Sequence, residues 1–267
     1  QPNGVRELGS CPYDDRVTAS NAAAPRWSPP GWAGAVGVAR CDITPPVGIR
    51  MRNWGYGDAD VSTGVHRPIT ATALAFAQAR EPGDDRPIAP ESVLVTADLG
   101  WWRTRADELG VRSAIAEATG LSLDRVLLHL THTHAGPSIC AEDVGLPGGE
   151  PVPGYLRLVA ERIAAAAASA VADLQPAELV TVATTHPLAA VRDLTADGTP
   201  LLGFDPDRVP DTTLLMGRIT DADGALIATM MNYACHPTTL GHDNDLLSPD
   251  FVGAARRLVE DATGAPC

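Results

Sequence analysis

The sequence predicts a single α/β domain in which mixed β-sheets are flanked by helices. Short apolar runs with the alternation of strands recur along the chain, and segments of helical length lie between several of them. With 267 residues, 45% of them apolar, the chain can bury a core of one large domain. The first 33 residues are rich in Pro, Ala, Ser and Asn and have no sustained period. We therefore expect a poorly ordered leader over residues 1–33 and the domain over residues 34–267.

The first half of the domain is expected to contain three strands and a helix. Residues 35–39, 69–79 and 91–97 have strand character, and the last of these runs ends beside Asp98. A helix is expected from Thr104 to about residue 119, where a glycine stops it.

The second half begins with a buried strand at Val126-Leu127-Leu128 and continues with strands and helices in alternation. A long apolar helix follows, then a strand, a hairpin joined by Asp-Ala-Asp-Gly, and a helix that opens at Ser-Pro-Asp. These elements are expected at residues 155–174, 178–184, 214–219 with 225–234, and 248–262.

The strand at Val126 leads into the most informative stretch of the chain, His132-Thr133-His134 followed by Ala-Gly-Pro. If the strand continues through them, His132 and His134 point to the same side. Two imidazoles at a strand exit can form a metal site or an acid/base pair. Simple hydrogen bonding at a strand end is an equally good interpretation of this motif alone.

A second strand, about a hundred residues later, ends in Asn-Tyr-Ala-Cys-His-Pro and presents His236. Histidines at two strand ends are what a metal site assembled across a sheet requires. A catalytic zinc site usually has three protein ligands and a water, and the sequence offers no obvious third ligand beside His132 and His236. The HExxH, GxSxG and P-loop motifs are absent from the sequence.

Charge and cysteine content exclude several other functions. The formal net charge is −13 without a basic cluster, which argues against nucleic acid and anionic membranes as partners. No lysine is present, which excludes lysine-dependent chemistry. The five cysteines are widely spaced without a CxxC pair, so neither a disulfide framework nor a thiolate zinc finger is expected. No apolar run reaches the length of a transmembrane segment.

Several motifs, in order, resemble the N-terminal catalytic domain of neutral/alkaline (non-lysosomal) ceramidases. They are VGVARCDITPPVG, GVHRPITATALAF, VTADLG, HTHAGP and NYACHPTTLG with LSPDFVGAARRLVE. The resemblance runs from about residue 35 to the end of the chain. It implies a zinc amidohydrolase that cleaves the N-acyl bond of ceramide to give sphingosine and a fatty acid.

The same resemblance implies roles for individual residues. His132 and His236 match zinc ligands, His134 matches a histidine at the reaction centre, and Arg192 matches an arginine that contacts the substrate or transition state. The family's remaining ligands, a glutamate and a tyrosine, and its active-site serine would lie beyond the last residue of this chain. We therefore expect an incomplete domain, truncated at its C-terminus and inactive on its own.

Three further residues are weaker candidates. His66 and Asp98 are expected to line the substrate site, although a strand-end cap explains Asp98 equally well. Asp250 can orient His236 as a carboxylate behind the metal ligand, although helix capping also explains it.

Two alternative functions stay open. One is a zinc esterase or amidase that acts on a smaller substrate, and the other is a non-catalytic binding module that keeps the fold. The expected partner is a lipid or another amide substrate. The resemblance favours a secreted or periplasmic location over the cytoplasm.

Overall fold

The computed structural model describes residues 31–55, 57, 59–80, 86–196 and 198–267. In this part of the chain, a seven-stranded sheet has the order β10-β9-β6-β1-β3-β4-β5. Its strands are β1 (Trp32–Asp42), β3 (Thr70–Gln78), β4 (Ser92–Ala97), β5 (Val126–Leu130), β6 (Gln175–Thr185), β9 (Thr213–Asp221) and β10 (Leu226–Tyr233). The short pairs are β2 (Gly64–Val65) with β11 (Leu246–Leu247) and β7 (Asp193–Ala196) with β8 (Thr199–Leu202). The helices are α1 (Arg105–Thr119), α2 (Val152–Ala172) and α3 (Asp250–Thr263), with 3-10 turns η1 (Leu123–Arg125) and η2 (Ala141–Gly145). The predicted α/β class is confirmed.

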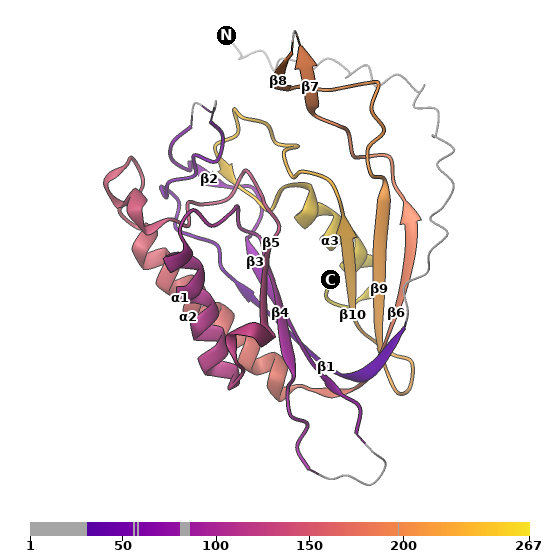
Figure 1. Ribbon diagram of the computed structural model, residues 1–267. Helices are drawn as coiled ribbons and strands as arrows, with labels where there is room; N and C mark the ends of the chain where they lie inside the picture. The colour runs from indigo at the N-terminus through magenta and orange to yellow at the C-terminus, as the bar shows by residue number, and fades with distance from the viewer. Residues whose placement is uncertain (1–30, 56, 58, 81–85, 197) are drawn as a thin grey trace, which may run out of the picture.

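Helices α1 and α2 cover the outer face of the sheet at β1, β3, β4 and β5 (Figure 1). Thr104 caps the start of α1 by accepting a hydrogen bond from the Asp107 amide, and Gly120 ends the helix in the left-handed conformation, as the sequence predicts. Helix α2 packs closely on β1 at Gly37, where a Cβ atom would lie 1.9 Å from the Ala170 carbonyl oxygen. Only glycine permits that approach, and the alanine-rich face of α2 completes the main core there.

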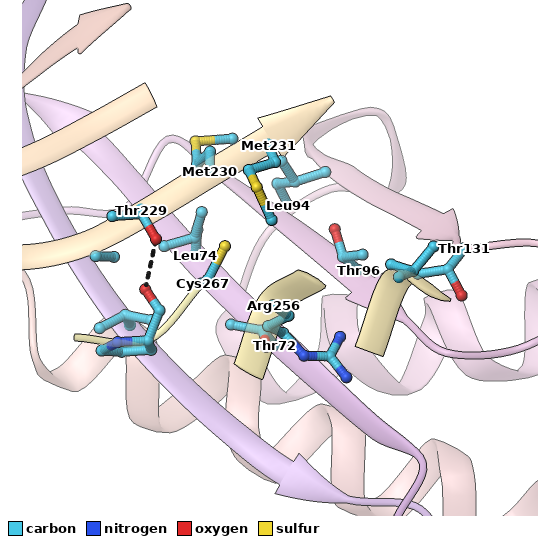
Figure 2. Close-up of a pocket in the computed structure, with 14 residues that line it drawn as sticks. Thr72, Leu74, Leu94, Thr96, Thr131, Thr229, Met230, Met231, Arg256 and Cys267 are labelled. Atoms are coloured by element: carbon cyan, nitrogen blue, oxygen red, sulfur yellow. Dashed lines mark hydrogen bonds between the residues drawn. The ribbon is translucent and has the colours of Figure 1, made fainter. Parts of the chain in front are cut away.

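The inner face of the sheet carries a second, smaller core and holds α3. Val36, Leu74, Ala177, Ile219 and Ala228 form this core on β1, β3, β6, β9 and β10. The sheet curves like a trough, and α3 lies inside the curve (Figure 1). A cavity of about 130 Å³, lined by residues of α3 and the inner faces of β1, β3, β4 and β10, remains beside the helix (Figure 2).

A buried ion pair fixes α3 against the sheet. Both terminal nitrogens of the Arg256 guanidinium donate to the two oxygens of Asp98, at 3.0 and 2.6 Å, and the Thr70 amide and hydroxyl also donate to that carboxylate. Asp98 is fully buried, so this arrangement satisfies a charge that would otherwise be costly.

The strand order determines where loops can meet. Neighbouring strands of the large sheet are antiparallel except β4 and β5, which are parallel and joined through α1. The carboxyl ends of β4 and β5 therefore lie at the same edge, where α/β folds place their sites. Strands β5 and β10 form opposite ends of the sheet, and the curvature of the sheet allows the chain segments that follow them to approach each other (Figure 1).

Three expectations about local structure need correction. Strand β5 ends at Leu130 and β10 at Tyr233, so the histidines stand on loops beyond the strands and strand alternation does not orient them. The last helix was expected to begin at residue 248, but α3 begins at Asp250, with Pro249 as its N-cap residue. The Ser248 hydroxyl accepts a hydrogen bond from the Asp250 amide at 3.1 Å.

The predicted leader falls mostly on residues 1–30, which lie outside the described residues; strand β1 begins at Trp32, inside the predicted leader. Among the described helices, none combines the length and the hydropathy needed to cross a membrane.

Candidate metal centre

The first histidine loop, residues 132–136, follows β5. The His132 amide donates to the Leu99 carbonyl at 2.9 Å, which anchors the start of the loop to the segment that follows β4. His132 has a φ of 67°, so the chain turns sharply there instead of continuing as a strand. Thr133 and Ala135, which face inward, are buried, so the loop is fixed by the protein interior.

The second histidine loop, residues 236–240, follows β10 at the other end of the sheet. His236 itself is exposed, and the loop meets the first one where the His134 amide donates to the Pro237 carbonyl at 3.4 Å. The carboxylate of Asp250 accepts hydrogen bonds from the Thr239 hydroxyl at 2.6 Å and from the Leu240 amide at 3.1 Å. These contacts attach the second histidine loop to the start of helix α3.

The two loops bring three imidazoles together. One possible ligand atom from each of His132, His134 and His236 lies within 4.8 Å of the other two. The Nε2 atoms of His134 and His236 are 2.7 Å apart, so an N–H of one ring donates to the other. The His132 ring lies 4.7 Å from that of His236 and 5.3 Å from that of His134, measured between centroids. The predicted meeting of these histidines is therefore observed, although loops achieve it and strand pleating does not.

Two tryptophans pack against this cluster. The Trp101 ring lies 5.0 Å from His132 and 5.1 Å from His134, and the Trp54 ring lies 4.7 Å from His134. Trp101 follows β4, so its place beside the histidines is a consequence of the parallel β4–β5 pair. Asn53 secures the Trp54 segment by donating to the Gly136 carbonyl at 2.6 Å. The indoles give the site one apolar wall.

The cluster favours neutral imidazoles. Burial, followed by repulsion from His236 and His132, lowers the pKa of His134 from its ordinary value of 6.5 to about 4. Burial also lowers the pKa of His132, and burial together with the charge of Arg192 lowers that of His236. All three rings are therefore neutral near pH 7, which is the form that binds a metal ion.

Three neutral imidazole nitrogens fit zinc, which accepts histidine ligands at about 2.0–2.1 Å. At that bond length, the nitrogen atoms of a tetrahedral zinc site are about 3.3 Å apart. The three possible ligand atoms here lie within 4.8 Å of one another, and the Nε2 atoms of His134 and His236 are 2.7 Å apart. A tetrahedral site therefore requires rearrangement of these side chains, which stand on loops.

Arg192 lies near the cluster, on the segment between β6 and β7. After burial, which is the main cause, its positive charge contributes to the lowered pKa of His236 and, to a smaller extent, of His134. Its carbonyl oxygen accepts a hydrogen bond from the Gly203 amide at 2.9 Å, which ties this segment to the end of β8. Its contact with a substrate stays a prediction.

The weaker candidates occupy supporting positions. The Asp98 carboxylate is paired with Arg256 on the inner face, and the Nδ1 atom of His66 lies 3.1 Å from the Ser248 hydroxyl oxygen. The predicted hydrogen bond from the His236 ring to the Asp250 carboxylate is not among the contacts of the described residues; the carboxylate supports the loop and not the ring. Substrate contacts of His66 and Asp98 stay predictions.

Sequence reasoning missed the residues that join the two loops. Thr133 donates from its hydroxyl to the Ser248 carbonyl at 2.7 Å, and the Ser248 amide donates to the Ala135 carbonyl at 2.9 Å. A buried serine and threonine carry no sequence signal of this pairing, because their partners are backbone groups more than a hundred residues away.

The sequence matches no protein-family model and no curated protein sequence. Solved structures with a similar fold include two ceramidases. One is described as "Crystal Structure Analysis of neutral ceramidase from Pseudomonas aeruginosa", with a TM-score of 0.65 and 23% identity over 86% of this chain and 36% of that chain. The other is described as "Ceramidase complexed with C2", with a TM-score of 0.64 and 22% identity over 86% of this chain and 35% of that chain. This chain spans about a third of the length of those proteins. It therefore shares the fold of part of neutral ceramidase, as the sequence motifs predict.

Proposed function

We propose that this chain carries the metal-binding part of a zinc-dependent amidohydrolase that cleaves the N-acyl amide bond of ceramide, giving sphingosine and a fatty acid. The observation that carries this proposal is the cluster of three imidazoles at the strand ends of a ceramidase-like fold. Because the chain spans about a third of the solved ceramidases, the activity is proposed for the protein at its natural full length.

In this proposal His132 and His236 hold the zinc ion, one from each loop. When bound, zinc polarises a carbonyl oxygen and makes water a nucleophile near neutral pH. The residues of the chain supply position and charge around that chemistry.

His134 has a separate role in the proposal. Its ring is neutral at pH 7 and lies within hydrogen-bond reach of His236, so it can take or give a proton at the reacting centre. Arg192 places a positive charge on the same side and would stabilise the negative charge that develops on an amide oxygen.

An apolar wall beside the imidazoles supports a lipid substrate. Trp54 and Trp101 contact His134, so a hydrocarbon chain next to the scissile bond would lie against indole rings. Val144 and Leu146 are exposed on and next to η2, whereas Ile139 is buried. One of the similar structures is described as a ceramidase in complex with C2.

The test compares two substrates with the zinc-loaded protein at its natural full length. We expect faster cleavage of a fluorescent N-acyl sphingosine than of a short N-acyl amino acid, and His132→Ala should abolish both activities. His129→Ala is the matched control, because this histidine stands exposed on β5, outside the cluster. Equal or reversed rates would favour the alternative of a zinc amidase or esterase for smaller substrates. Full activity of His132→Ala would contradict the metal centre itself.

A further inference from the structure

We infer that residues 248–250 set the distance between the two histidine loops and that Asp250 is a positioning residue for His236. This inference rests on the proposed metal centre and adds to it the part of the chain that holds the centre together. Residues 248–250 connect β11 to α3 and lie between the loops.

The need for such a connection comes from the sheet. The loop that carries His132 and His134 follows β5, and the loop that carries His236 follows β10, at opposite ends of seven strands. Small changes in the curvature of the sheet would therefore separate the imidazoles. Among the described residues, the one direct backbone bond between the loops, from the His134 amide to the Pro237 carbonyl, is long at 3.4 Å.

Ser248 holds the first loop through buried contacts. Its carbonyl accepts from the Thr133 hydroxyl at 2.7 Å, and its amide donates to the Ala135 carbonyl at 2.9 Å. Ser248 and Thr133 are fully buried. Breaking these bonds would leave polar groups unpaired in the interior, so the loop and Ser248 move together.

Asp250 holds the second loop with both carboxylate oxygens. Oδ1 accepts from the Thr239 hydroxyl at 2.6 Å and from the Thr239 amide at 3.2 Å, and Oδ2 accepts from the Leu240 amide at 3.1 Å. The carboxylate also accepts from the Phe251 amide at 2.6 Å, which fixes its orientation at the first turn of α3. The loop that begins with His236 is thereby attached to the helix.

The backbone of Asp250 is held in an unusual conformation. Its φ is 57°, and its amide donates to the Ser248 hydroxyl, which also lies 3.1 Å from the Nδ1 atom of His66. A residue other than glycine in this region persists where its surroundings favour it, and such positions gather near functional sites. With this backbone conformation, the Asp250 carboxylate faces the second histidine loop while Ser248 contacts the first.

Cobalt binding tests this inference without an activity assay, because Co²⁺ can replace zinc at histidine sites and its visible absorption reports coordination geometry. The variants are Asp250→Gly, which keeps the positive φ but removes the carboxylate, and Asp250→Asn, which keeps one acceptor oxygen. Asp261→Asn is the matched control, because Asp261 lies exposed on the same helix. Urea unfolding of each metal-free variant is measured in parallel.

We expect Asp250→Gly to weaken Co²⁺ binding by about 10-fold or more and to change the visible spectrum, with partial rescue in Asp250→Asn and no change in Asp261→Asn. Wild-type affinity and spectrum in Asp250→Gly would overturn the inference while the metal centre stands. A wild-type protein that binds no Co²⁺ would instead overturn the proposed function and this inference with it. If Asp250→Gly does not fold, Thr133→Val tests the other attachment, and an unchanged spectrum in that variant overturns the inference.

Discussion

The two histidine loops differ in how the protein holds them. Residues 132–136 lie in the interior, with Thr133 and Ala135 buried and the His132 amide bonded to the Leu99 carbonyl just after β4. Residues 236–240 lie nearer the surface, with His236 and Thr239 exposed, and depend on the Asp250 carboxylate. One half of the centre is therefore preformed by the core, and the other is added to it by a few polar contacts.

Because of this difference, we expect substitutions in the two loops to affect protein stability and metal binding to different extents. A change in the buried loop disturbs the core and the metal centre together, whereas a change in the outer loop disturbs mainly the metal centre. Both loops supply an imidazole, so the loss of either ligand should be equally severe for the metal.

The largest expected effect follows the loss of a ligand from either loop. His132→Ala and His236→Ala should each weaken zinc binding by more than about 100-fold. Loss of a residue that only hydrogen-bonds to a metal ligand already weakens binding by up to about 100-fold. Isothermal titration with zinc at pH 7.5 measures this, with His129→Ala as the control. A variant from one loop that keeps wild-type affinity would show that this loop supplies no ligand.

The next effect concerns the free energy of unfolding, which should fall more for a substitution in the first histidine loop than in the second. Thr133→Val removes a buried hydroxyl that donates to Ser248 and accepts from the Ala135 amide, and should lower the free energy of unfolding by about 1–3 kcal/mol. Thr239→Val removes a hydroxyl that donates to Asp250, but the carboxylate keeps the amide donors of Thr239, Leu240 and Phe251, so the cost should be smaller, less than about 1 kcal/mol. Urea unfolding of the metal-free proteins gives both values. Equal losses would contradict the distinction between a buried and an outer loop.

A smaller effect concerns pH. The pKa of His134 is about 4 in the folded protein and near 6.5 when unfolded, so the unfolded chain binds the proton first as pH falls. The metal-free protein should therefore lose stability as pH drops from 6.5 toward 4, and His134→Gln should lose less over that range. Unfolding by urea at pH 7.5 and pH 5 measures the difference between the two proteins. The same loss in both would show that His134 takes up its proton equally well in the folded state.

Local signals predicted the helices and strands well, because each depends on neighbouring residues. The Thr104 cap, the Gly120 stop and the apolar face of α2 can all be recognised within one turn or a few turns of helix. The curvature that brings the ends of β5 and β10 together is a property of the whole sheet, and no single segment encodes it.

The candidate site was predicted in part for the same reason. The three histidines stand out by residue type and spacing, so they could be found without knowing how the chain turns at His132. The pairing of Asp98 with Arg256 spans 158 positions, and the attachment of Thr239 to Asp250 depends on a positive φ. Neither can be derived from alternation or composition.

The measurement that tests the metal centre most directly is X-ray absorption at the zinc edge of the zinc-loaded protein. We predict nitrogen ligands at about 2.0–2.1 Å with the outer-shell scattering of at least two imidazoles, and loss of imidazole scattering in His132→Ala and His236→Ala. A zinc shell without imidazole scattering, or a spectrum that both variants leave unchanged, would contradict the centre formed by the two loops.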